Sequence, residues 1–133
     1  MYYAQVLLED KAPKGLIPFI IEGTFGNKIN CLDIDESFIV NEVEFGNHGH
    51  LGANGSRGSL TQFVKWNIKI TTGHTHSAAR QDGVLIAGTS TILRPPYVKG
   101  ASSWINADVI QHTNGKRQHL IWRENGKCSN VEI

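Results

Sequence analysis

The stretch Ile68-Lys69-Ile70-Thr71-Thr72-Gly73-His74-Thr75-His76 decides the fold. Its first five residues are mostly apolar or β-branched, which predicts a strand, and Gly73 marks the point where the chain leaves the sheet. His74 and His76 then lie two residues apart in a short loop at the carboxyl end of this strand. Open α/β sheets build their sites at such ends. Two imidazoles at this spacing are able to bind one metal ion, or two neighbouring ions if other residues complete the site.

A second glycine-flanked loop, Gly46-Asn47-His48-Gly49-His50, carries two further histidines. The residues before it, 43–45, predict a strand, and 60–65 predict a helix for which Ser59 is a good N-cap. Together, residues 43–76 predict a βαβ unit with both histidine loops on one edge of the sheet. We therefore expect imidazoles from the two loops to lie side by side.

The other segments predict a frame around this unit. Residues 1–10 are expected to form a short helix, 16–21 an edge strand or extended loop because of Pro18, and 23–30 a turn. Residues 38–45 predict a hairpin that turns at Asn41-Glu42. After the βαβ unit we expect a polar loop at 77–83, a strand at 84–87, a long loop at 88–103, and a hairpin of 104–111 and 117–122 around Asn114-Gly115. The tail after Arg123 predicts a turn with a frayed end. We expect one mixed α/β domain spanning residues 1–133.

Composition and charge exclude several classes of protein. The 133 residues are 40% hydrophobic and carry a formal net charge of +1, as in an ordinary globular domain. Such a balance provides no overall attraction to nucleic acid or membranes, although it leaves room for a local basic patch. No apolar run approaches a membrane span, and Cys31 and Cys128 have no metal-type spacing. A cytoplasmic, soluble protein with reduced thiols and no membrane partner is expected.

The two histidine loops carry a resemblance to a known family. Gly73-His74-Thr75-His76 resembles the last signature motif, Gly-His-x-His, of the calcineurin-like metallophosphoesterases, and His48-Gly49-His50 resembles the motif before it. Residues 52–59, 88–91 and 102–104 resemble phage-encoded members in particular. The resemblance covers about residues 37–122. It implies an α/β fold that is the C-terminal half of a metallophosphoesterase-type β-sandwich, flanked by helices, with a mixed sheet and a C-terminal β-hairpin.

By position, the resemblance assigns His48 and His74 to one metal ion and His76 to a second. A site of this family holds two divalent cations about 3.5–4 Å apart, which offset the charge that develops on the phosphoryl oxygens. Mn²⁺, Zn²⁺ and Fe²⁺ are the cations that suit such ligands. The substrate implied is a phosphate ester.

Another alignment of the first loop is possible. Gly46-Asn47-His48 also matches the family's Gly-Asn-His motif, but a further histidine is then required between this motif and Gly73, and residues 51–73 contain none. The His-Gly-His alignment is therefore preferred. It leaves Asn47 without a role and makes His50 a catalytic group on the substrate side of the metal or behind its ligands.

The sequence departs from the family in its acidic motifs. It contains neither Asp-x-His nor Gly-Asp-x-x-Asp, which in the family supply the bridging aspartate and half of the first metal's ligands. Three explanations follow: another polypeptide supplies these ligands, the chain is a fragment, or the domain is catalytically inactive.

Two further residues, Arg57 and Tyr97, are candidates for roles beside the metal. Arg57 is the best candidate for a phosphate contact, because it lies in a glycine-rich loop before a helix N-terminus, where backbone N–H groups favour anions. Tyr97 is a weaker candidate that would reach the site from the long loop. Ser59 is interpreted as a helix cap, and Trp66, Trp104 and Trp122 as packing residues.

The function expected from these observations is hydrolysis of a phosphate ester, with nucleic acid or a nucleotide as the favoured substrate. The alternatives are a catalytically incomplete module that binds a metal or a partner, and a mononuclear histidine enzyme. A half-sheet that lacks its neighbour exposes an apolar edge, so association with a second chain or with itself is also expected.

Overall fold

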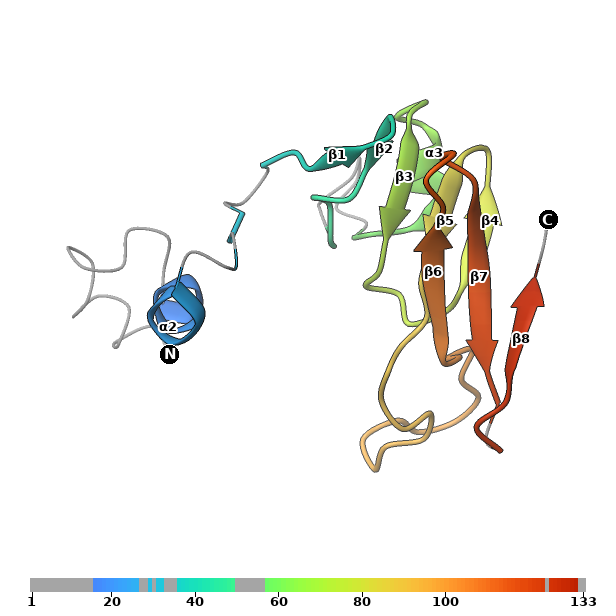
Figure 1. Ribbon diagram of the computed structural model, residues 1–133. Coiled ribbons are helices and arrows are strands. Elements are labelled where there is room, and N and C mark those ends of the chain that lie inside the picture. Colours follow the sequence, from blue (N-terminus) through green and yellow to red (C-terminus); the bar gives the residue numbers. More distant parts are fainter. Residues whose placement is uncertain are drawn as a thin grey trace. The chain divides into compact units, whose positions relative to one another are not determined.

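The computed structural model of the chain describes residues 16–26, 29, 31–32, 36–49, 57–123 and 125–131, with residues 16–19, 22, 130 and 131 described by their backbone alone. Its elements are α2 (Leu16–Phe25), β1 (Ile39–Val40), β2 (Val43–Glu44), α3 (Leu60–Val64), β3 (Lys69–Thr72), β4 (Ala79–Gln81), β5 (Val84–Ile86), β6 (Ala107–Gln111), β7 (Arg117–Trp122) and β8 (Cys128–Val131). Figure 1 shows these elements along the chain. The chain divides into two compact units, residues 1–36 and 37–133, and the second contains the motif-bearing segment.

The first unit contains helix α2, where the sequence predicted an edge strand or an extended loop. That prediction was wrong. Pro18 is the third residue of the helix, a position at which its missing N–H costs no hydrogen bond because the first four N–H groups of a helix have no partner within it. The helix also extends through Gly23, which was expected to lie in a turn. It ends at Phe25, beside Gly26 with a φ of +61°, the left-handed conformation that often terminates helices. The helix predicted for residues 1–10 lies outside the described residues.

The five-stranded sheet of the second unit confirms the predicted βαβ unit. Its strand order is β1-β2-β3-β5-β4. Strands β2 and β3 pair in parallel, with Val43 opposite Lys69 and Glu44 opposite Ile70. Helix α3 connects them and is capped by the Ser59 hydroxyl, which accepts from the Gln62 backbone N–H. Because β2 and β3 are parallel neighbours, the loops that follow them leave the same edge of the sheet.

Two tight turns connect antiparallel neighbours in this sheet, and the sequence predicted one of the two turns. Asn41 and Glu42 both have positive φ and join β1 to β2 as expected. Asp82 and Gly83, with φ of 44° and 83°, join β4 to β5 in the same way. Residues 79–81 were predicted to be loop, which was wrong. The Asp-Gly pair between them and Val84 is a strong hairpin signal, and it was the available indication of β4.

The C-terminal sheet has three antiparallel strands in the order β6-β7-β8. The hairpin of β6 and β7 around Asn114-Gly115 is confirmed, with Gln111 opposite Arg117. The tail was predicted to be frayed, but residues 128–131 form β8, which pairs with β7. An unpaired edge of β7 and a turn at Asn125-Gly126, where Gly126 has a φ of +73°, allow this third strand.

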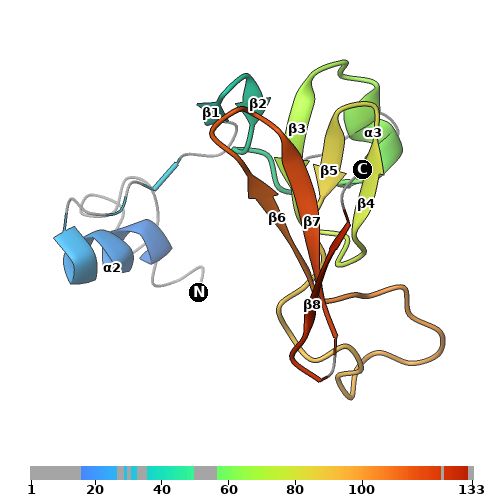
Figure 2. The ribbon, with the colours of Figure 1, turned by 45° about the vertical axis from the view of Figure 1, so that its right-hand side comes forward.

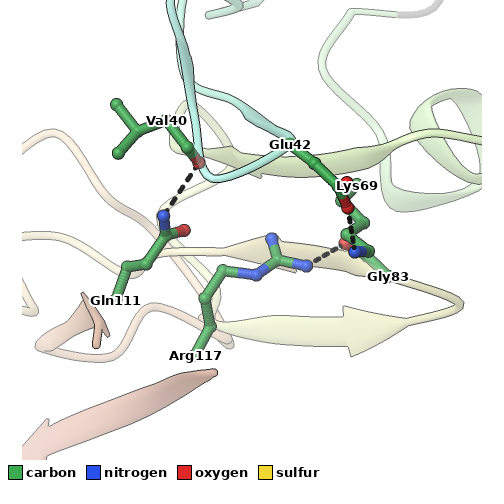
Figure 3. A network of polar contacts seen from close by, with 6 residues as sticks. All are labelled: Val40, Glu42, Lys69, Gly83, Gln111 and Arg117. Carbon is green, nitrogen blue, oxygen red and sulfur yellow. Dashed lines mark hydrogen bonds and ion pairs between the residues drawn. The ribbon is translucent and has the colours of Figure 1, made fainter. Parts of the chain in front are cut away.

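The two sheets pack against one another, as Figures 1 and 2 show for β6, β7 and β5. Polar groups join them: the Arg117 guanidinium on β7 donates to the Ile70 and Gly83 carbonyls at 2.7 and 2.5 Å, and His119 Nε2 lies 3.0 Å from the Ile86 carbonyl oxygen. Figure 3 shows Arg117 reaching Gly83. The apolar core lies within the larger sheet and beneath α3, around Phe63, Ile70, Val84 and Ile86.

The described residues thus form a mixed α/β fold with few helices, a mixed five-stranded sheet and an antiparallel C-terminal sheet. Within this part of the chain, neither helix has the length and apolar character needed to cross a membrane.

Candidate functional site

The candidate site is built on the loops that follow β2 and β3. The Thr72 hydroxyl, at the end of β3, donates to the Asn47 carbonyl at 2.5 Å. This hydrogen bond joins the start of one histidine loop to the backbone of the other. The two loops therefore have a fixed separation set by the parallel pairing of their strands.

His48 and His74, from the two loops, lie against one another. Their ring centroids are 5.4 Å apart and their planes are at 90°. His48 is exposed, whereas His74 is half-buried. The predicted juxtaposition of one imidazole from each loop is thus present, and these are the two residues that the resemblance assigns to one metal ion.

Three glycines make this close approach possible. A Cβ atom at Gly49 would lie 2.7 Å from His74 Nδ1, and one at Gly58 would lie 2.8 Å from His74 Cδ2. On the other ring, a Cβ atom at Gly73 would lie 3.2 Å from His48 Cε1. Gly49 and Gly58 thus lie against the His74 imidazole, where a larger residue would displace the ring.

The backbone of the second loop adopts an unusual conformation at both of its histidines. His74 and His76 have φ of 89° and 61°, a region that costs a residue with a side chain about 1–3 kcal/mol and that is concentrated at functional sites. In this conformation the His76 ring lies against the segment between β5 and β6.

His76 contacts an aromatic pair in that segment. Its ring centroid lies 4.3 Å from that of Trp104, with the planes at 83°, and its carbonyl oxygen accepts from the Ile105 N–H at 3.1 Å. Tyr97 lies 6.3 Å from Trp104, centroid to centroid. Trp104 was interpreted from the sequence as packing, and it does pack, but against a candidate ligand. Its place in a segment resembling phage-encoded relatives was the only signal for this role.

Glu44 fixes the start of the first loop from within the sheet. Its buried carboxylate accepts hydrogen bonds from the Ser37 hydroxyl, from the Phe38 N–H at 3.0 Å and from the Gly46 N–H at 2.5 Å. Burial raises the pKa of this carboxyl, but the donated hydrogen bonds outweigh burial, and the net pKa lies below its ordinary value. The sequence did not indicate this role, because Glu44 occupies a solvent-type position in the hairpin pattern.

The two predicted catalytic residues, His50 and Arg57, lie between His48 and His74 in the sequence. Arg57 is exposed and directly precedes Gly58, the residue in contact with His74. His50 lies outside the described residues. Across the ranges that are described, no three His, Cys, Asp or Glu side chains come together in a group able to hold a metal ion. A metal site built on His48 and His74 would therefore need further ligands.

A comparison with known proteins found a relative of this chain in a bacteriophage. The chain is 47% identical over 96 residues to Protein A1 of Escherichia phage T5. The match covers 72% of this chain and 17% of the relative, so the chain spans about one sixth of that protein's length. No protein-family model matches the chain, and no solved structure matches it.

Proposed function

We propose that this chain supplies the histidine half of a metal-dependent phosphoesterase site, and that a phosphodiester such as nucleic acid is its substrate. The observation that carries the proposal is the contact between the His48 and His74 rings, which come from two loops at the carboxyl ends of neighbouring parallel strands. Neutral imidazoles are good ligands for Zn²⁺, Mn²⁺ and Fe²⁺.

The surroundings of the pair support a binding role over a purely structural one. Gly49 and Gly58 lie where a side chain would collide with the His74 imidazole, Gly73 leaves only tight clearance to His48, and His74 has a strained backbone. A histidine that served only to fill space would need neither feature. The arrangement fits a metal ligand whose ring position is held from both sides.

In this proposal each candidate site residue has a defined role. His48 and His74 hold the cation, and His76 holds a second one from its place beside Trp104. A bound divalent cation stabilises negative charge on the phosphoryl oxygens and lowers the pKa of water. Arg57 contacts a phosphoryl oxygen, and His50 interacts with the substrate next to the metal.

The remaining ligands are proposed to come from another segment or another chain. The sequence has no Asp-x-His or Gly-Asp-x-x-Asp motif, and more than four fifths of the phage relative lies outside the matched region. At the edge of the larger sheet, Phe38 and Ile39 are exposed to 50% and 64%, which supports association with a second chain or with another copy of this one.

A second candidate function is a catalytically incomplete module that binds one metal ion or a partner. The missing third ligand among the described side chains favours it. The two candidates agree on metal binding by His48 and His74 and differ on turnover.

The experiment that separates them measures Mn²⁺ and Zn²⁺ binding by calorimetry and hydrolysis of a small generic phosphodiester by the same preparation. His74→Ala is expected to abolish both, while His112→Ala, which removes an exposed histidine from the β6–β7 turn, is the matched control and leaves both unchanged. Metal binding without turnover, also after addition of a polypeptide that carries the missing acidic ligands, supports the binding module. Turnover that persists in His74→Ala excludes the proposed site.

A further inference from the structure

A hollow at the opposite end of β3 from the histidines gathers positive charge. It has a volume of about 640 Å³ and lies between the start of β3, the β4–β5 turn and the tip of the β6–β7 hairpin. The residues that line it are Lys69, Arg80, Gly83, Leu85, His112, Asn114, Gly115, Lys116, Arg117 and Gln118. We call this surface the basic hollow.

Four of its lining residues are cationic, and none is acidic. Lys69 comes from β3, Arg80 from β4, and the adjacent Lys116 and Arg117 from the β6–β7 hairpin, so three segments contribute. The whole chain has 13 basic and 12 acidic residues, so a lining with four cations and no carboxylate is a marked separation of charge. Such a surface raises the local concentration of anions.

Arg117 is held in the basic hollow by neutral groups and lies near the charge of Arg80. Its guanidinium donates to the Ile70 and Gly83 carbonyls and to the Thr71 hydroxyl, all of them neutral groups. Burial lowers the pKa of Arg117, and the nearby charge of Arg80 lowers it further. The two guanidinium groups thus repel one another, and an anion bound between them would relieve this repulsion.

The basic hollow continues into a neighbouring one of about 500 Å³, which shares Lys69, Asn114, Gly115 and Lys116 with it. Glu42 lies on this neighbouring side, where its carboxylate is 3.1 Å from Lys69 Nζ. Figure 3 shows Arg117, Lys69 and Glu42 around this junction. Together the two hollows are lined by four cations and one carboxylate, so an elongated ligand with several negative charges fits their net charge and combined shape better than a single small anion.

We propose that the basic hollow binds the phosphate backbone of a nucleic-acid strand and so holds a polymeric substrate on the chain, away from the histidine loops. The choice of nucleic acid among polyanions rests on the proposed phosphodiesterase function, whereas anion binding as such rests on the charges alone. Arg80 and Lys116 are the residues that contact phosphates. Arg117 keeps its hydrogen bonds to the larger sheet and contributes its charge.

The test measures binding of a fluorescent single-stranded oligonucleotide by anisotropy in the presence of EDTA, so that metal chemistry plays no part. Arg80→Glu and Lys116→Glu are each expected to weaken binding about tenfold, because each replaces an attraction by a repulsion. The slope of log affinity against log salt should become less steep by about 0.7 for each phosphate that the variant no longer neutralises.

The matched control is Lys127→Glu, which makes the same charge change at the β7–β8 turn, at the other end of the C-terminal sheet in Figure 1. It is expected to leave affinity within about twofold of the wild type, since long-range charge effects are screened by salt. The neutral variant Lys116→Gln is also expected to weaken binding, while its thermal unfolding midpoint stays at the wild-type value. Weaker binding in this folded variant cannot be due to loss of folding.

Three outcomes would overturn the inference: no binding by the wild type, an equal decrease in affinity in Lys127→Glu, or binding of inorganic phosphate without binding of the oligonucleotide. The last result would identify a small-anion site. If the oligonucleotide binds as described but no phosphodiester is hydrolysed, the proposed function fails and this inference stands. If a phosphodiester is hydrolysed but the oligonucleotide does not bind, this inference fails and the proposed function stands.

Discussion

Gly49 lies so close to His74 that a Cβ atom on it would come within 2.7 Å of the imidazole Nδ1. The contact joins the loop after β2 to the loop after β3 at a candidate metal ligand. Gly49 also has a φ of +63°, so two independent requirements, space and conformation, both demand glycine at this position.

The first prediction concerns this contact. Gly49→Ala should displace the His74 ring and lower metal affinity by about tenfold to a hundredfold, as removal of a ligand's supporting residue does in other metal sites. Isothermal titration with Zn²⁺ measures the decrease. Gly126→Ala is the control, because Gly126 has a φ of +73° but open space around it. If both variants lose affinity equally, backbone strain and not the ring contact is responsible.

The second prediction concerns the junction of the two sheets at Gly88. A Cβ atom there would overlap the Ile105 carbonyl oxygen and lie 2.9 Å from the Ala107 nitrogen, and both are backbone atoms that side-chain rotation cannot move. Gly88→Ala should lower the free energy of unfolding by about 3 kcal/mol or more, as severe overpacking does. Urea denaturation measures this value. A decrease below about 1 kcal/mol would show that the junction is loose.

The third prediction concerns Arg117, whose fork bridges β7 to the Ile70 and Gly83 carbonyls. Arg117→Ala should destabilise the fold by about 2–4 kcal/mol, because it removes the charge-assisted hydrogen bonds to the Ile70 and Gly83 carbonyls that join the two sheets. Arg117→Lys should recover less than half of this stability, since an ammonium group lacks the planar fork. Full recovery by lysine would mean that charge, not geometry, holds the sheets together. Thermal denaturation compares the variants.

The fourth prediction is a pH dependence that arises from Glu44. Its folded-state pKa is lowered from the ordinary value of 4.5, so the ionised carboxylate stabilises the fold above that pH, and the contribution is lost as pH falls through the folded-state pKa. Glu44→Gln should therefore cost about 1–3 kcal/mol at neutral pH and progressively less in acid.

Urea denaturation of wild type and Glu44→Gln at neutral pH and at several values below 4.5 measures this difference. Glu42→Gln is the control, because its carboxylate is exposed and pairs with an exposed Lys69, an arrangement that contributes little to stability. A Glu44→Gln difference that stays constant with pH would contradict the assignment.

Local patterns of the sequence predicted much of the second unit. The β-branched run before Gly73, the N-cap Ser59 and the Asn-Gly turn near residue 115 each act over a few residues, and β3, α3 and the β6–β7 hairpin appear where these signals place them. The errors at Pro18, Asp82-Gly83 and residues 128–131 have a different origin. The first two are local signals given the wrong weight, whereas β8 depends on a free edge of β7 that its own residues do not reveal.

The amino-acid sequence by itself determined which residues are available as ligands and that β2 and β3 deliver two of them to one edge of a sheet. That much follows from the periodicity of strands and the handedness of a βαβ crossover. Only the tertiary structure decided that the His48 and His74 rings meet edge to face, that His76 lies against Trp104, and that Arg80, Lys116 and Arg117 share one hollow. These outcomes depend on glycine clearances, backbone φ values and the packing of two sheets, which join residues far apart in the chain and leave no periodic trace in the sequence.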